Sequence, residues 1–134
     1  MIRKFLEKLA SDESDKIVLL DPSALGSAKP EPDLRIIGMF CDVHEEKVAE
    51  IIHAMLYLNE MNKFEKKAED KRPIEFYLST YGGSADDMFA LYDIMRTIRQ
   101  TSEIHTLGLG KVMSAGVLLL AGVTKGKRRI AKNC

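Results

Sequence analysis

The sequence predicts an α/β domain with a largely parallel sheet, and three observations lead to this fold class. Short apolar segments typical of strands alternate along the chain with longer segments whose apolar residues recur at helical spacing. Glycine, serine or aspartate follows the strand-like segments, where each hands over to a helix. No motif repeats at a fixed period. Such alternation implies crossover connections and parallel strand pairing.

Residues 1–33 are expected to lie outside the packed domain. Residues 1–10 carry apolar side chains on one face and predict a short helix, whereas residues 11–33 are rich in small and polar residues. Prolines at positions 22, 30 and 32 disfavour regular structure there, which indicates a flexible linker. The packed domain is therefore predicted over residues 34–134.

The first strand is predicted over residues 34–40, as a buried strand, and a long helix follows it. Asp42 is suited to cap this helix, with Glu45 in the position of a capping box. The helix is predicted to end near Phe64, and residues 65–72 form a charged loop. Its buried stripe is expected to contain Val48, Ile51, Ile52, Met55, Leu56 and Asn59.

The second half of the domain continues the alternation. Residues 74–78 predict a strand, residues 79–83 a turn, and Ser84 with Asp87 the start of a second long helix. The buried stripe of that helix is expected to contain Met88, Leu91, Met95 and Ile98. A third strand is predicted over residues 104–109, an apolar helix opening at Ser114, and a short strand over residues 129–131.

Composition narrows the functional classes. The chain has 134 residues, 46% hydrophobic and 30% charged, which is typical of a soluble globular protein with one main core. Twenty basic residues balance twenty acidic ones, so charge gives no reason to expect nucleic acid or an anionic membrane as partner. Cys41 and Cys134 lack metal-ligand spacing, so neither a metal nor a disulfide framework is expected. No signal peptide is visible and the apolar run 115–123 is too short to span a membrane, so a cytoplasmic location is expected.

Two glycine-containing segments carry the candidate chemistry. Gly82-Gly83 and residues 110–116 both lie where a predicted strand ends and the next helix begins. In parallel sheets these strand-to-helix connections gather at one edge. Ser114 could there supply an attacking oxygen, with the backbone N–H groups of Gly83 and Ala115 holding an oxyanion. The alternative is a tight turn and two helix caps. The pattern Gly-x-Ser-x-Gly is not met, because Val112 occupies its first glycine position.

Other reactive or charged residues have simpler explanations. His44 suits helix capping or solvation, His53 is expected to be exposed, and His105 lies near the start of its strand rather than at the handover edge. Cys41 is interpreted as a buried small residue. The basic run 125–129 is interpreted as a solvated turn and strand edge in preference to a binding patch.

Several segments together resemble the proteolytic subunit of the Clp protease family, in order and with near-constant spacing over about residues 34–134. They are Arg35-Ile36-Ile37, the long helix after it, residues 74–78, Gly82-Gly83-Ser84, Leu91-Tyr92-Asp93-Ile94-Met95, residues 110–116 and residues 122–128. The resemblance implies a crotonase-like fold of repeated β-β-α units with its C-terminal part missing. It also implies that Ser114 is the nucleophile and that Gly83 and Ala115 form the oxyanion hole. Tyr81 and Met113 depart from the proline and alanine usual in the family, and the chain is slightly longer between Ile98 and Ile104.

The same resemblance implies the biochemical setting. The protein would be a serine endopeptidase subunit of an ATP-dependent Clp protease, forming stacked heptameric rings and degrading unfolded polypeptides. An AAA+ unfoldase partner would hydrolyse ATP, and this chain itself has no phosphate-loop spacing and is expected to need no cofactor. The family's histidine base would fall a few residues beyond Cys134, and its aspartate further on, so negligible peptidase turnover is expected from this chain alone.

Three alternatives remain open at this level. One is a non-catalytic ring or assembly subunit, and a second is a phage-type maturation protease of similar fold. The third is a crotonase-like acyl-CoA enzyme, which uses paired backbone donors without a serine nucleophile.

Overall fold

Four parallel strands form one sheet, in the order β1-β2-β3-β4, in the computed structural model, which describes residues 34–134. The strands are β1 (Ile36–Met39), β2 (Ile74–Thr80), β3 (Ile104–Val112) and β4 (Arg128–Ile130). The helices are α2 (Glu45–Phe64), α3 (Ala85–Ile98) and α4 (Ala115–Ala121), with a short 3₁₀ turn, η2 (Ala68–Asp70). Every neighbouring strand pair is parallel, which confirms the predicted α/β class. The helix and linker predicted within residues 1–33 lie outside the described residues.

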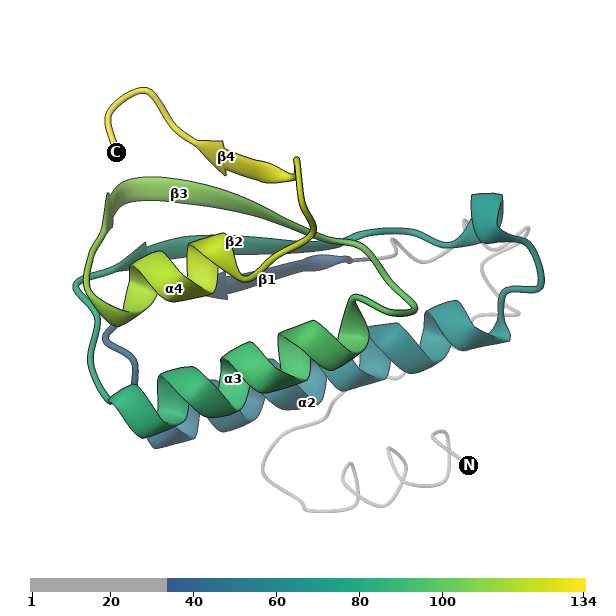
Figure 1. Ribbon diagram of the computed structural model, residues 1–134, viewed down its shortest axis with the longest axis horizontal. Coiled ribbons are helices and arrows are strands. Elements are labelled where there is room, and N and C mark those ends of the chain that lie inside the picture. Colours follow the sequence, from purple (N-terminus) through teal and green to yellow (C-terminus); the bar gives the residue numbers. More distant parts are fainter. Residues whose placement is uncertain (1–33) are drawn as a thin grey trace, which may run out of the picture. The chain divides into compact units, whose positions relative to one another are not determined.

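The helices α2, α3 and α4 pack on one face of the sheet (Figure 1). Burial along β2 alternates accordingly: Ile74, Phe76 and Leu78 are fully buried, and the residues between them are only half-buried. The buried side chains of α3, namely Met88, Leu91, Met95 and Ile98, are those predicted from its helical spacing. One hydrophobic core therefore lies between the sheet and the three helices.

The prediction that the first strand is buried was wrong. β1 has only four residues, and Leu34, Ile36 and Phe40 are 75%, 56% and 62% exposed. The physical reason is position: among residues 34–134, β1 pairs with β2 alone and lies at the edge of the sheet, and Met39 is its only fully buried residue. Apolar content alone does not distinguish an edge strand from a central one.

The prediction that Asp42 caps the first long helix was also wrong. α2 starts after His44, whose Nδ1 accepts a hydrogen bond from the Lys47 backbone N–H at 3.4 Å. Val43 pairs in parallel with Gly83, and its N–H donates to the Gly82 carbonyl at 2.8 Å, so the chain is still extended there. By contrast, Ser84 Oγ accepts from the Asp87 N–H at 3.3 Å, as predicted for α3.

The stripe predicted for α2 is confirmed in most positions. Val48, Ile51, Met55 and Asn59 are buried, Ile52 is partly buried, and Leu56 is 39% exposed. The helix also buries Asn62, which was not predicted. Its amide donates to the Arg72 carbonyl at 2.9 Å and to Ser102 Oγ at 2.8 Å, and accepts from Arg35 Nη1 at 3.1 Å. Asn62 thus joins the segments that lead into β1, β2 and β3.

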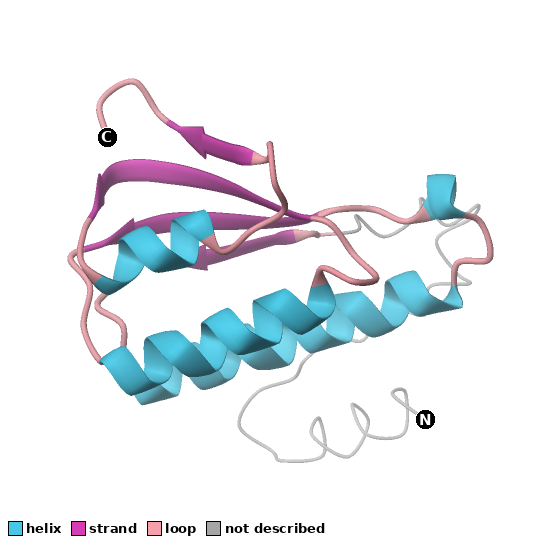
Figure 2. Cartoon of the chain, viewed as in Figure 1, coloured by secondary structure: helices cyan, strands magenta, loops and turns pink. Residues whose placement is uncertain are grey.

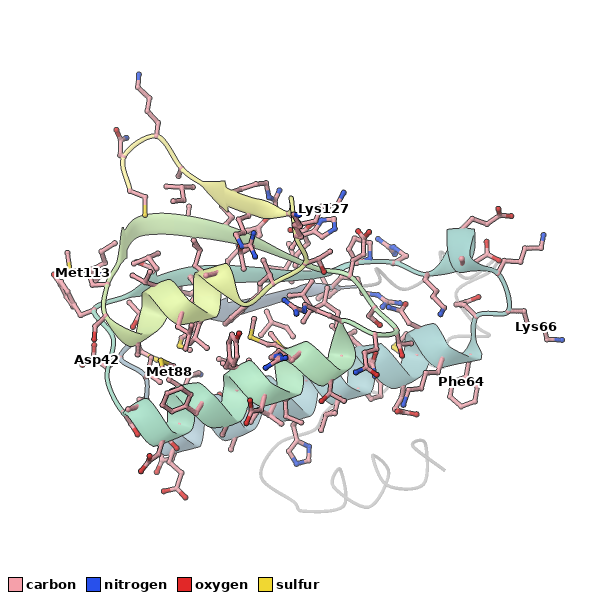
Figure 3. All side chains as sticks on the ribbon, in the orientation of Figure 1. Asp42, Phe64, Lys66, Met88, Met113 and Lys127 are labelled. Carbon is pink, nitrogen blue, oxygen red and sulfur yellow. The ribbon has the colours of Figure 1, made fainter. Side chains whose placement is uncertain are left out.

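The connections that follow β1, β2 and β3 gather at one end of the domain formed by residues 34–134, where they lead into α2, α3 and α4 (Figure 2). Asp42 and Met113, from two of these connections, lie at that end, whereas Phe64 and Lys66 lie at the opposite end (Figure 3). This is the sheet edge at which parallel α/β folds form their sites. Among the described helices, none combines the length and apolar character that a membrane crossing requires.

Candidate active site

Ser114 occupies a strained turn between β3 and α4. Its φ is 50° and its ψ is −124°, and it is the one non-glycine residue among those described with positive φ. The side chain is exposed and makes no capping hydrogen bond, although Ser114 stands at the N-cap position of α4. Residues held in such a region cost of order 1–3 kcal/mol and cluster at functional sites. A role as a helix cap would not account for this backbone strain, because the Ser114 side chain makes no capping hydrogen bond.

Neighbouring backbone bonds hold the turn in place. The Met113 N–H donates to the Thr80 carbonyl at 3.0 Å, and the Gly116 and Val117 N–H groups donate to the Met113 and Ser114 carbonyls, each at 2.9 Å. A Cβ built at Gly116 would lie 2.5 Å from Thr80 Cγ2. The end of β2 and the start of α4 therefore approach closely, which leaves Ser114 at the tip of the turn.

The turn Gly82-Gly83 lies directly against Ser114. A Cβ built at Gly82 would be 2.7 Å from Ser114 Cβ and 3.1 Å from Ser114 Oγ, so only glycine fits there. Gly82 has a φ of 106° and Gly83 a φ of 153°. The structure thus brings together the two segments that the sequence placed at the same sheet edge.

Gly83 is fixed from its other side by the loop before α2. The Ser84 N–H donates to the Val43 carbonyl at 2.9 Å, and Val43 N–H donates to Gly82, so the two segments pair around Gly83. Neither the Gly83 N–H nor the Ala115 N–H donates a hydrogen bond to any described residue. Ala115 is buried, where an N–H group normally finds an acceptor, and Gly83 is exposed; the N–H groups of both residues remain available to a ligand oxygen.

None of the three histidines of the sequence contacts Ser114. His44 caps α2 and lies with its Nε2 3.8 Å from Cys41 Sγ, and His53 is exposed, as predicted. His105 lies near the start of β3, with Nδ1 3.4 Å from Glu75 Oε1 and Nε2 2.7 Å from Glu103 Oε2. Both of its ring nitrogens therefore face carboxylates away from the turn.

Because of the His105–Glu103 contact, the free energy of unfolding is expected to fall as the pH becomes acidic. The hydrogen bond from His105 holds the pKa of the Glu103 carboxyl below its usual value, and Lys127 adds a smaller contribution. A carboxyl with a lowered folded-state pKa stabilises the fold above its unfolded pKa, and that stabilisation is lost as pH falls through the folded value. We expect a small effect, because the Glu103 side chain is 54% exposed.

Urea unfolding between about pH 6 and about pH 3 checks this expectation. Wild type should lose more stability on acidification than Glu103→Gln. Glu69→Gln, which removes a carboxylate that is 77% exposed, is the control and should follow wild type. Parallel pH profiles for wild type and Glu103→Gln would contradict the role of the contact.

Two cavities flank the Ser114 turn. One of about 280 Å³ is mainly apolar and is lined by Gly110, Lys111, Val112, Met113, Val117, Leu120, Ile130 and Cys134. The other, of about 390 Å³, is lined by Phe40, Cys41, Asp42, Ser79, Thr80, Tyr81 and Lys111. The Lys111 Nζ lies 4.7 Å from the centre of the Tyr81 ring, a cation–π distance.

Sequence reasoning missed Lys111 and misjudged Cys41. Cys41 was interpreted as buried, but it is partly exposed and lines the larger of these cavities. Lys111 comes three residues before Ser114, and only the fold shows that it reaches Tyr81. No group of three or more His, Cys, Asp or Glu residues suited to a metal ion occurs between residues 34 and 134.

The sequence of this chain is similar to those of known proteases. The family described as Clp protease matches residues 32–134. The ATP-dependent Clp protease proteolytic subunit 1 of Leifsonia xyli subsp. xyli is 39% identical over 100 residues, which cover 74% of this chain and 46% of that protein. The subunit 1 of Thermobifida fusca is 33% identical over 99 residues, covering 74% of this chain and 40% of that protein.

A solved structure gives the same result. The ClpP protease catalytic domain from Plasmodium falciparum superposes with a TM-score of 0.62 at 30% identity, covering 72% of this chain and 49% of that one. The chain spans less than half the length of the curated relatives described above. The family match over residues 32–134 and the shared fold show that the chain belongs to the Clp protease family.

Proposed function

We propose that this chain is part of a serine endopeptidase of the ATP-dependent Clp type, with Ser114 as its nucleophile. The observation that carries the proposal is the backbone of Ser114, strained at positive φ in an exposed turn, with a side chain that makes no capping bond. A structural cap gains nothing from this conformation, whereas a nucleophile gains exposure of its Oγ. Family membership supports the same role.

The proposed reaction is acyl transfer. Ser114 Oγ attacks the carbonyl carbon of the peptide bond and loses its proton to a general base, which gives a tetrahedral intermediate. The N–H groups of Gly83 and Ala115 donate to its oxyanion. The C–N bond then breaks, the amine leaves with the proton, and water hydrolyses the acyl-enzyme on Ser114.

The described histidines do not provide the base. His44, His53 and His105 are engaged or exposed elsewhere, so we assign to this chain the nucleophile and the oxyanion donors only. We expect negligible peptide hydrolysis by the 134-residue chain on its own. The test of the nucleophile must therefore supply a base.

We further propose the setting in which such a subunit works. It would assemble with copies of itself into stacked heptameric rings in the cytoplasm, receive unfolded polypeptides from an AAA+ unfoldase, and leave ATP hydrolysis to that partner. The relatives' names support the coarser part of this setting, a proteolytic subunit of an ATP-dependent Clp protease. Exposed apolar residues in and next to β1, namely Leu34, Ile36 and Phe40, provide surface for association.

Covalent labelling of Ser114 tests the proposal. The chain is incubated with a fluorophosphonate, with and without added imidazole, and the adduct is located by peptide mass mapping. We expect an adduct on Ser114 that forms faster when imidazole supplies the missing base. Ser114→Ala should give no adduct at this peptide, and Ser79→Ala, which alters a nearby serine lining the 390 Å³ cavity, should label like wild type.

The outcome separates the alternatives. A folded chain that forms no Ser114 adduct even with imidazole would favour a non-catalytic assembly subunit or a crotonase-like acyl-CoA enzyme over a peptidase. Circular dichroism confirms the fold of each variant. An adduct on another residue, such as Tyr81, would also count against Ser114 as the nucleophile.

A further inference from the structure

A third cavity, of about 720 Å³, lies away from Ser114, between the last turn of α3 and the loop that joins α4 to β4. Its lining residues are Asp93, Arg96, Thr97, Arg99, Gln100, Thr124 and Lys125. α3 begins beside the Gly82-Gly83 turn and has 14 residues. At a rise of about 1.5 Å per residue, its last turn is about 20 Å from that turn, so the cavity is separate from the candidate active site.

The cavity carries a net positive charge, from the side chains of three exposed residues. Arg96, Arg99 and Lys125 line it, and Asp93 is its only carboxylate among the described lining residues. None of the three cations forms an ion pair within residues 34–134. Like charges gathered at one concave surface raise the local positive potential and attract anions.

Two of the donors are held in position before any ligand binds. Arg99 Nη1 donates to the Gly122 carbonyl at 2.7 Å and to the Val123 carbonyl at 3.0 Å, while its Nε and Nη2 donate to no described residue. Thr124 Oγ1 accepts from the Ile104 N–H at 2.9 Å, so its hydroxyl proton remains free to donate. Fixed donors lose little conformational freedom on binding.

The arginines at the end of α3 also have a structural role, but this role does not explain why all three cations line the cavity. Cations in the last turn of a helix balance the negative end of its dipole, which explains Arg96 and part of the placement of Arg99. Lys125 belongs to a different element, the loop before β4, and yet lines the same cavity. Convergence of cations from two elements is the arrangement expected of an anion site.

We propose that this cavity binds an oxyanion of the phosphate class, either free phosphate or the phosphoryl group of a nucleotide. The planar guanidinium of Arg99 offers two N–H donors to paired phosphate oxygens, and Lys125 and Thr124 contribute further donors. The volume is within the range of small-molecule sites. The proposal is independent of peptidase activity, because none of these residues contacts the Ser114 turn.

Isothermal titration with inorganic phosphate and, separately, with adenosine monophosphate tests the proposal. Sodium chloride at matched ionic strength is the reference. We expect saturable binding of at least one of the two ligands by the 134-residue chain. Tighter binding of the nucleotide would identify a phosphoryl ester as the ligand, and equal or tighter binding of phosphate would identify the free ion.

Matched variants localise the binding. Lys125→Gln and Arg96→Gln should each weaken it about tenfold, the loss expected for one charge-assisted contact. Lys66→Gln removes an exposed cation in the loop just after the end of α2 (Figure 3) and should bind like wild type. Heats that match sodium chloride, or an equal loss in Lys66→Gln, would overturn the proposal. Arg99→Gln is avoided because Arg99 also anchors the end of α4.

Discussion

Gly83→Ala is expected to lower the free energy of unfolding by about 3 kcal/mol. A Cβ at Gly83 would lie 2.2 Å from the Val43 carbonyl oxygen and 2.8 Å from the Val43 nitrogen. Both are backbone atoms held by the pairing of Val43 with Gly82 and Ser84, so they cannot move aside as a side chain would. The φ of 153° adds strain for any residue with a Cβ.

Urea unfolding of wild type, Gly83→Ala and Gly126→Ala measures this effect. Gly126 also has positive φ, at 83°, but a Cβ there would meet nothing within 4 Å. Gly126→Ala therefore reports conformational strain alone, and we expect it to cost about 1 kcal/mol. If the two variants lose equal stability, the close contact with Val43 is not the main cause of the loss at Gly83.

How much of the fold could be predicted varies with how local its cause is. For α3, the cap at Ser84 and every residue of the buried stripe were predicted correctly, because both features are determined within the helix itself. The parallel sheet followed from the alternation of elements. These features need no information from distant segments.

The errors concern residues whose state depends on distant segments. Asp42 has the right chemistry for a cap, but pairing of Val43 with Gly83 keeps the chain extended until His44. Asn62 looks like a surface residue on a charged helix end, yet Arg72 and Ser102 converge on it and make its burial favourable. No local pattern reports either contact.

The candidate site was predictable in position but not in mechanism. The glycines at 82 and 83 and the serine at 114 marked the correct sheet edge, because both follow strands of a parallel sheet. A serine before an apolar helix, however, is equally typical of a cap and of a nucleophile. The backbone angles and the missing cap bond at Ser114 are the observations that favour our proposal of a nucleophile over a cap.

The strained backbone of Ser114 leads to a second prediction, in which one substitution abolishes labelling but increases stability. Ser114→Gly should abolish fluorophosphonate labelling at this position and raise the free energy of unfolding by about 1 kcal/mol. Glycine adopts a φ of 50° with a ψ of −124° without steric cost, and the relief of strain exceeds its larger loss of chain entropy. Because the Ser114 side chain makes no capping bond, little is lost with it.

Ser114→Ala is the matched control, since it removes the hydroxyl but keeps the Cβ that causes the strain. It should abolish labelling equally and leave stability near that of wild type. Thermal or urea unfolding of the three proteins, with labelling measured in parallel, gives both readouts. If Ser114 were a structural cap, Ser114→Ala would destabilise the chain by about 1 kcal/mol and Ser114→Gly by only a few tenths of a kcal/mol. A gain for glycine alone means that the fold retains a strained serine at a cost in stability, as expected where the side chain serves a reaction.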